Sequence, residues 1–330
     1  MRGADSRLGL HSWRVLSIPI VLFAVLGPAS AQDAIQGDFP HKISHLSHSS
    51  APAVVRRNVD LVLVPVTVVD KSEKTVNGLH LEDFTLLDEK TPQEIKYFSS
   101  EDSPLSLTVV LDASGSMATQ IRSARQAVFD LFKSSNPEDE FRVITVSSRP
   151  TSVASIGASM EEVCENLNQV KPSGFTSLWD AIYLGVSEMK GSQFRRKAMV
   201  VISDGGDNHS RYTENEIKSI LEESDMLVYA VGLFDPRANR LEERLGPLRL
   251  DEVTGVTGGR VFPAHSAQEM NDAIQKINRE LRNQYVLGYS PSANPELKGK
   301  WHKLKVHLNR EPEKSNLRVY ARKGYYAARD

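Results

Sequence analysis

The sequence contains a single cysteine, Cys164, among 330 residues. One thiol excludes an internal disulfide, so a hydrophobic core has to supply the stability of the fold. Cys164 shares a predicted helical face with Leu167, and we expect its thiol to be buried and unreactive. The chain also lacks an excess of either charge, with 40 Lys and Arg against 42 Asp and Glu. This balance gives no indication of a nucleic-acid or anionic-membrane partner.

Long hydrophobic runs are missing as well. A membrane-spanning helix needs about 20 apolar residues, and the mostly apolar run at 15–26 has only 12. It follows Arg2, Arg7 and Arg14 and precedes the small residues at 29–31. This pattern predicts a Sec-type signal peptide at 1–31, with an uncleaved anchor as the alternative. Cleavage would remove three Arg and one Asp, which changes the net charge from −2 to −4 and leaves no transmembrane segment. We therefore expect a secreted or periplasmic protein.

The segments on either side of the middle of the chain favour β-structure. Residues 32–54, rich in Ser, His and Pro, are expected to form a flexible linker. Runs of β-branched and aromatic residues then predict strands at 59–69, 84–87 and 94–98, and again at 285–289, 304–308 and 317–321. Pro65 predicts that the first of these is an edge strand or carries a bulge.

Between these flanks, strand-like and helix-like runs alternate. Strands are predicted at 105–111, 141–147, 198–203, 227–233 and 259–262, and helices at 116–132, 160–170, 178–189, 214–223, 241–254 and 267–281. This alternation predicts an α/β fold with a doubly wound, mainly parallel sheet and helices on both faces.

The order of the segments predicts a split domain. Neither β-rich flank has enough strands to form a stable core alone. We expect 55–102 and 285–330 to pair as the two parts of one antiparallel β-sandwich, with the α/β domain at 103–284 inserted between them. Two unrelated β-appendages are the alternative.

Oxygen-bearing side chains follow three of the predicted segments. Asp112, Ser114 and Ser116 follow the strand at 105–111, Thr176 lies in a loop before a helix, and Asp204 follows the strand at 198–203. In a doubly wound sheet, ligands gather outside the carboxyl ends of the strands. We expect these five side chains to meet there.

Two carboxylates and three hydroxyls suit a hard divalent cation such as Mg²⁺, or Mn²⁺ or Ca²⁺. The absence of Cys and His from the set argues against zinc. Helix capping is the alternative interpretation, and it has most weight for Thr176. Asp180 is expected to stabilise the start of a helix, and Asp207 and Asn208 to lie in a solvated loop at the rim.

The same stretch does not favour a hydrolase. A nucleophile elbow needs Gly-x-Ser-x-Gly, and Asp112 occupies the first glycine position relative to Ser114. His209 is the one nearby histidine by sequence order, and no acid at a fixed spacing orients it. We therefore expect a protein that is not an enzyme, with a serine hydrolase as a remote alternative.

The series Asp112-x-Ser114-x-Ser116, then Thr176, then Asp204-Gly205, resembles the metal-ion-dependent adhesion site of the von Willebrand factor type A (VWA) domain family. The resemblance covers residues 104–283. It implies that Ser114 and Ser116 contact the metal directly, while Thr176, Asp112 and Asp204 do so directly or through water. It also implies that a carboxylate of a partner protein or peptide fills the remaining position.

The flanks are similar to those of a bacterial group, the VWFA-related proteins frequent in Acidobacteria. The segments that carry this second resemblance are 58–64, 78–84, 93–98 and 285–289. Together the two resemblances imply an exported adhesion or scaffold module that binds a partner through its metal. A structural envelope protein, whose metal only stabilises the loops, is the alternative. The oligomeric state stays open.

Overall fold

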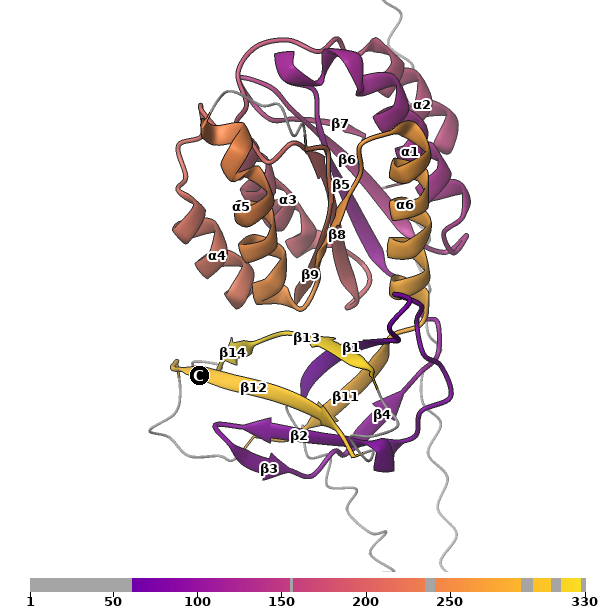
Figure 1. Cartoon of the computed structure of the whole chain (residues 1–330), viewed down its shortest axis with the longest axis vertical. Helices are drawn as coiled ribbons and strands as arrows, with labels where there is room; N and C mark the ends of the chain where they lie inside the picture. Colours follow the sequence, from indigo (N-terminus) through magenta and orange to yellow (C-terminus); the bar gives the residue numbers. More distant parts are fainter. Residues whose placement is uncertain (1–60, 155–156, 235–240, 292–298, 310–315, 328–330) are drawn as a thin grey trace, which may run out of the picture. The chain divides into compact units, whose positions relative to one another are not determined.

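The computed structural model describes residues 61–154, 157–234, 241–291, 299–309 and 316–327. The predicted signal peptide and linker lie outside the described residues. The described part consists of one mainly parallel sheet with helices and two antiparallel sheets (Figure 1).

The central sheet has six strands in the order β10-β9-β8-β5-β6-β7. Parallel pairing joins β5 to β6 and β8, and continues through β9 to β10. The strands are β5 (Ser106–Asp112), β6 (Glu140–Val146), β8 (Lys197–Ser203), β9 (Met226–Gly232), β10 (Val261–Pro263) and β7 (Thr151–Ala154). Every residue of β5 and β9 is buried, as expected of strands covered on both faces.

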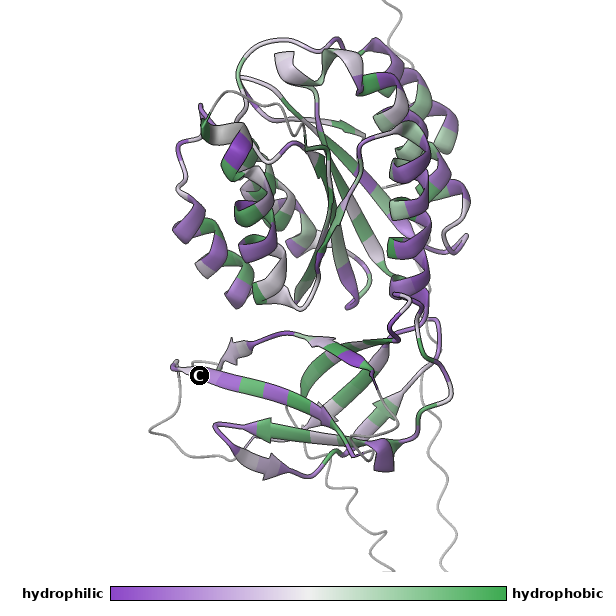
Figure 2. Cartoon of the chain, in the orientation of Figure 1, coloured by the Kyte–Doolittle hydropathy of each residue, from purple (hydrophilic) through white to green (hydrophobic). Residues whose placement is uncertain are grey.

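Helices pack on both faces of this sheet, which confirms the predicted fold class (Figure 1). One core includes residues of α1 (Ile121–Lys133), α2 (Met160–Gln169) and α6 (Ala267–Arg282). The core on the opposite face includes residues of α3 (Leu178–Glu188), α4 (Glu214–Glu223) and α5 (Leu241–Thr257). The hydrophobic stripes of the helices face the sheet and their polar sides face outward (Figure 2).

Each antiparallel sheet combines strands from both ends of the described chain. The first has the order β13-β1-β11-β4, formed by Arg318–Ala321, Val62–Val69, Tyr285–Tyr289 and Tyr97–Ser99. The second has the order β14-β12-β2-β3, formed by Gly324–Tyr326, Trp301–Leu308, Phe84–Asp88 and Thr91–Gln93. Both sheets contribute to one core that includes Val64, Leu86, Tyr285 and Leu304. The flanks of the α/β region therefore share one hydrophobic core.

The prediction that Pro65 marks an edge strand or a bulge is wrong. β1 lies between β11 and β13, and its register with β11 continues through Pro65 without a shift. β1 pairs with β11 over residues 62–66 and with β13 over residues 66–69. Pro65 therefore has a ladder partner on one side only. The missing amide proton is tolerated because β13 does not reach that position.

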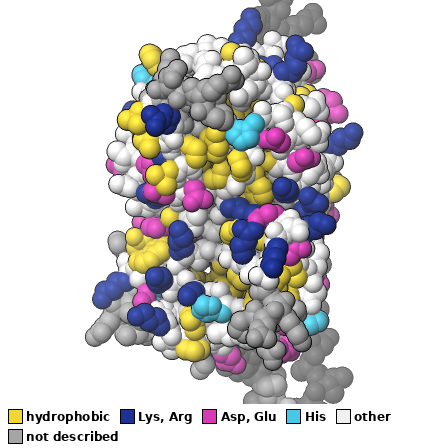
Figure 3. Space-filling model, in the orientation of Figure 1, with side chains coloured by type: hydrophobic (Ala, Val, Ile, Leu, Met, Phe, Trp, Pro, Cys, Tyr) yellow, Lys and Arg dark blue, Asp and Glu magenta, His cyan; other side chains and the backbone are white. Residues whose placement is uncertain are grey.

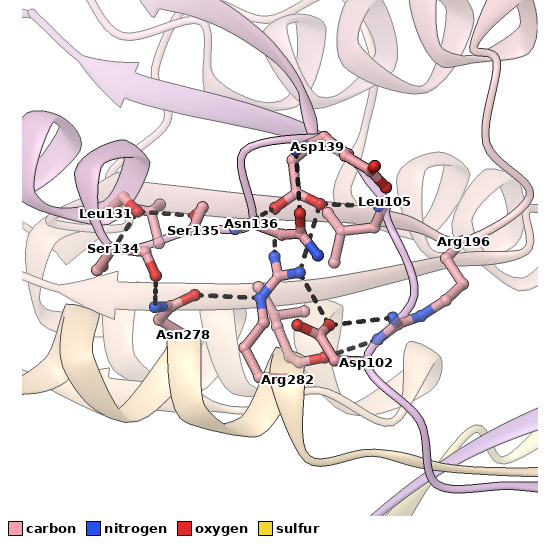
Figure 4. Close-up of polar contacts among 12 residues, drawn as sticks. Asp102, Leu105, Leu131, Ser134, Ser135, Asn136, Asp139, Arg196, Asn278 and Arg282 are labelled. Atoms are coloured by element: carbon pink, nitrogen blue, oxygen red, sulfur yellow. Dashed lines mark hydrogen bonds and ion pairs between the residues drawn. The ribbon is translucent and has the colours of Figure 1, made fainter.

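An ion-pair network lies where the chain passes between the α/β region and the antiparallel sheets (Figure 4). Arg282, at the end of α6, pairs with Asp139 at 2.5 Å and with Asp102 at 3.1 Å. Arg196 pairs with Asp102 at 3.7 Å and donates a hydrogen bond of 2.6 Å to the carbonyl of Leu281. The network therefore fixes both crossing segments to the same end of the α/β region.

Cys164 is partly exposed, so the prediction of a buried thiol is wrong. Val163 and Leu167 form the buried side of α2, and Cys164 is rotated away from it. Desolvation, followed by the charge of Glu161, raises the pKa of the Cys164 thiol above its ordinary value. The thiol is thus protonated at neutral pH, which keeps its reactivity low.

The described helices include none that is both long and apolar enough to cross a bilayer. Basic and acidic side chains are interspersed on the face of the molecule seen in Figure 3. This mixture agrees with the nearly balanced charge of the sequence.

Candidate metal site

Asp112 is the last residue of β5, and its side chain is completely buried. One carboxylate oxygen, Oδ1, accepts a hydrogen bond of 2.9 Å from the backbone N–H of Ser114. The other, Oδ2, accepts a hydrogen bond of 2.7 Å from the hydroxyl of Ser203. Both oxygens are therefore oriented by the chain at the carboxyl edge of the sheet.

Three of the other predicted residues form a continuous series beside Asp112. The hydroxyl oxygens of Ser114 and Ser116 lie 3.1 Å apart, and Ser116 donates a hydrogen bond of 2.8 Å to Oδ2 of Asp204. Asp204 is oriented by a hydrogen bond of 2.8 Å from the backbone N–H of Gly206 to Oδ1. The structure thus brings Asp112, Ser114, Ser116 and Asp204 together, from segments 88 residues apart.

Thr176 lies in the neighbouring loop. Backbone hydrogen bonds join this loop to the first one, from Gly115 to Gly174 at 3.2 Å and from Ser173 to Ala113 at 2.9 Å. Thr176 is almost completely buried. Within the part of the chain that the structure describes, its hydroxyl makes no hydrogen bond to the other four side chains. The loop that carries Thr176 therefore lies beside the first loop. The hydroxyl of Thr176 is not part of the hydrogen-bonded series.

The electrostatics of the site are unfavourable to the charged form of Asp112. Burial, and then the nearby negative charge of Asp204, raise the pKa of Asp112 from 3.8 to about 6. Hydrogen bonds from Ser203 and Ser114 oppose this effect only in part. An ionised Asp112 therefore costs free energy unless a cation compensates it.

Several residues that orient the site were not predicted, or were predicted to have another role. Ser203 was missed, although it donates to Asp112 and accepts a hydrogen bond of 3.0 Å from Gly205. Asn208 accepts a hydrogen bond of 2.9 Å from the backbone N–H of Thr176, and Asp207 accepts one of 3.2 Å from Trp179. The rim loop is therefore tied to the Thr176 loop. The position of Ser203 directly before Asp204 was the one available signal.

Asp180 lies in the first turn of α3, as predicted, and it also secures the rim loop. Its Oδ1 accepts hydrogen bonds of 2.9 Å and 3.1 Å from the backbone N–H groups of Arg211 and Tyr212. Both oxygens of Asp180 face this loop, since Oδ2 pairs with Arg211 at 3.4 Å. Asp180 thus supports the loop that follows Asp204.

Two glycines allow α5 to approach the Asp204 loop closely. Gly205 has a positive φ of 77°, and a Cβ there would lie 2.7 Å from the Cα of Gly246. A Cβ on Gly246 would lie 2.1 Å from the carbonyl oxygen of Asp204. No residue with a side chain fits at Gly246 without displacing this loop.

The donor set fits a hard divalent cation better than a soft one. It consists of oxygen atoms from two carboxylates and from serine and threonine hydroxyls. The described residues include no group of three or more His, Cys, Asp or Glu side chains that could hold a metal ion. The carboxylates alone are therefore too few, and a cation here would rely on the hydroxyls and on water or a partner.

The segment that contains the candidate site matches the model of one protein family. Residues 107–206 match the family model described as the von Willebrand factor type A domain. This segment contains all five predicted site residues. No curated protein matches the chain.

Several solved structures match the chain at low identity. An aerotolerance-related membrane protein from Bacteroides fragilis is 19% identical, with 54% of this chain and 98% of that chain covered and a TM-score of 0.44. A von Willebrand factor type A protein from Catenulispora acidiphila is 10% identical, with 82% and 74% covered and a TM-score of 0.48. Identities this low assign no function.

Proposed function

The chain contains a von Willebrand factor type A domain, and on that premise we propose that it is a protein-binding module that depends on a divalent cation. Domains of this family are commonly protein-interaction modules. The partner of this chain would be a protein or peptide that supplies a carboxylate. The cation would be Mg²⁺, with Mn²⁺ or Ca²⁺ as other hard ions that accept oxygen ligands.

The observation that carries the proposal is the burial of Asp112 beside Asp204. A fully buried carboxylate whose pKa rises to about 6 next to a second carboxylate is an arrangement that a cation stabilises. A purely structural capping residue would not need a second carboxylate such as that of Asp204, which directly follows another strand, β8. The pair therefore supports a metal-binding role.

Each residue of the set would have a defined task. Ser114 and Ser116 would contact the cation directly, since their hydroxyls already lie side by side at 3.1 Å. Asp112, Asp204 and Thr176 would complete the shell directly or through water. A bound cation supplies the positive charge that attracts the acidic group of the partner.

The contacts of Ser114 do not support a nucleophile. Its hydroxyl lies beside that of Ser116, and the ring of His209 stacks on Phe175 instead. Activation of a serine requires a base within hydrogen-bond reach. We therefore propose a protein that binds and does not catalyse. Export through the signal peptide at 1–31 is part of the same proposal.

Capture of partners by the secreted form, in Mg²⁺ and in EDTA, tests the proposal. We expect EDTA, and the substitution Asp112→Ala, to abolish capture while the protein stays folded by circular dichroism. The control is Asp251→Ala, which removes an exposed carboxylate on α5 and should leave capture intact. A large loss of stability in EDTA would instead favour a purely structural metal. Turnover of an acyl substrate that Ser114→Ala abolishes would favour a hydrolase.

A further inference from the structure

An exposed aromatic pair lies directly beside the candidate metal site. Phe175 is 59% exposed, which is unusual for a side chain of its size. Its ring stacks on that of His209, with 5.1 Å between the ring centroids and 20° between the ring planes. We call these two residues the aromatic ledge. His209 is also exposed, so solvent reaches both rings.

The backbone holds the aromatic ledge in place from both sides. The backbone N–H of Phe175 donates a hydrogen bond of 3.0 Å to the hydroxyl of Ser148. Gly174, which precedes it, has a positive φ of 78°, and a Cβ there would lie 2.4 Å from that same hydroxyl. The backbone N–H of His209 donates to the carbonyl of Thr176 at 3.1 Å. The exposed rings thus stand on loops that are fixed by hydrogen bonds.

The position of the aromatic ledge is set by the site itself. Phe175 precedes Thr176 in the chain, and His209 is bonded to the backbone of the same Thr176. Both rings therefore stand on the segments that flank Thr176, one of the predicted ligands of the cation. A partner residue adjacent to the acidic one is therefore within reach of the ledge.

The surroundings of the ledge favour a negatively charged peptide over other occupants. Arg149, next to Ser148, is exposed, and the side chain of Arg211, two residues after His209, is 88% exposed. Cations at the rim of an interface attract acidic partners and orient them as they approach. An exposed aromatic surface suits an aromatic side chain, which gains both buried area and ring stacking.

We propose that the aromatic ledge binds the partner residue next to the acidic group, and that it favours an aromatic side chain at that position. This inference rests on the proposed function, because the ledge acts on a partner whose carboxylate is at the cation. Scattered exposed hydrophobic residues are common on protein surfaces. Phe175 differs from these because it is stacked, fixed and placed at the edge of the candidate site.

The test uses random peptides displayed on phage, bound to the full chain in Mg²⁺ and eluted with EDTA. Wild-type protein should enrich peptides with an acidic residue that has an aromatic neighbour. Phe175→Ser should still enrich the acidic residue and lose the aromatic preference. Tyr97→Ser, which removes a 45% exposed aromatic from β4 in the antiparallel sheets, is the control and should behave as wild type.

A synthetic peptide of the enriched sequence then gives the magnitude. We expect Phe175→Ser to weaken its binding by about tenfold, with Mg²⁺ affinity unchanged. Two outcomes would overturn the role of the ledge. Wild-type protein could enrich acidic peptides that show no aromatic preference, or Phe175→Ser could enrich peptides with the same aromatic preference as wild type. A Mg²⁺-dependent dimer that Phe175→Ser dissociates would overturn it too, since a second copy would then occupy the ledge. Failure of wild-type protein to enrich any acidic peptide would instead overturn the proposed function.

Discussion

At the residue scale, the site depends on a carboxylate in an unfavourable place. Asp112 is buried at the end of a fully buried strand, and its charge is opposed by that of Asp204. The difference between its folded-state pKa of about 6 and the ordinary value of 3.8 corresponds to about 3 kcal/mol of folding free energy at neutral pH. The metal-free fold therefore carries a cost that binding of a cation would remove.

The sign of this effect gives a pH prediction. Because the pKa of Asp112 is raised, its contribution to stability is complete below 3.8 and is lost as the pH rises through about 6. Mg²⁺ competes with the proton for the same carboxylate. We therefore expect Mg²⁺ to raise the melting temperature at about pH 7.5 and to have little effect at about pH 5. Differential scanning fluorimetry measures both values.

The matched variant for this prediction is Asp112→Asn. The amide keeps an oxygen that can accept the hydrogen bond from Ser114 but carries no charge. It should be more stable than the metal-free wild type at neutral pH and should show no stabilisation by Mg²⁺. A Mg²⁺ effect on Asp112→Asn equal to that on wild type would contradict the assignment of Asp112.

Sequence spacing was sufficient to predict that four of the side chains that follow strand ends lie close together. Asp112, Ser114, Ser116 and Asp204 come together because the carboxyl ends of β5 and β8 are adjacent. The hydrogen bond that the side chain of Asn208 accepts from the backbone N–H of Thr176 was not predictable. It depends on how a loop folds back over 32 residues of sequence, and no periodic pattern encodes that path.

At the element scale, helix α5 is packed against the loop of the candidate site. The carbonyl of Asp204 leaves no room for a Cβ at Gly246. This contact transmits any displacement of α5 to Asp204, because backbone atoms meet without an intervening flexible side chain.

We expect Gly246→Ala to weaken Mg²⁺ binding by about tenfold, since overpacking of this kind displaces the backbone. The metal ligands themselves are unchanged in this variant, so the loss of affinity would come from displacement of the Asp204 loop. Gly191→Ala is the control, because a Cβ there meets nothing within 4 Å. Titration calorimetry with Mg²⁺ measures both. Equal affinity in the two variants would show that α5 does not position the loop.

Elements with strong periodicity were predicted closely, whereas short ones were missed. The bounds of α4 and β11 agree with the prediction, since α4 is clearly amphipathic and β11 is rich in aromatic and aliphatic residues. β7 and β14 were missed, because four and three residues are too few to show a period. The position of β1 within its sheet was mispredicted, because Pro65 indicates only that one neighbouring strand does not pair at that residue.

At the scale of the whole molecule, the α/β region has cores of its own, and the core of the antiparallel sheets combines residues of both flanks. The core of the antiparallel sheets takes Val64 and Leu86 from one flank and Leu304 and Tyr325 from the other. A flank expressed alone would expose these side chains to water. The hydrophobic effect therefore couples two segments that are separated by the α/β region.

This organisation predicts the behaviour of fragments. Residues 103–284 should fold alone, with a cooperative thermal transition by circular dichroism. Residues 55–102 should lack such a transition, because half of their core is missing. Mixing 55–102 with 285–330 is the informative control, since the shared core predicts mutual folding. A cooperative transition of 55–102 by itself would contradict the split arrangement.

Titration calorimetry of the full chain with Mg²⁺ tests the central claim most directly. Wild-type protein and Asp251→Ala should bind one Mg²⁺ with similar affinity, and Asp112→Ala should bind none while its circular dichroism spectrum stays unchanged. This result would establish that the buried carboxylate at the end of β5 holds a cation. Unchanged Mg²⁺ binding by Asp112→Ala, or no binding by the wild type at neutral pH, would contradict the account.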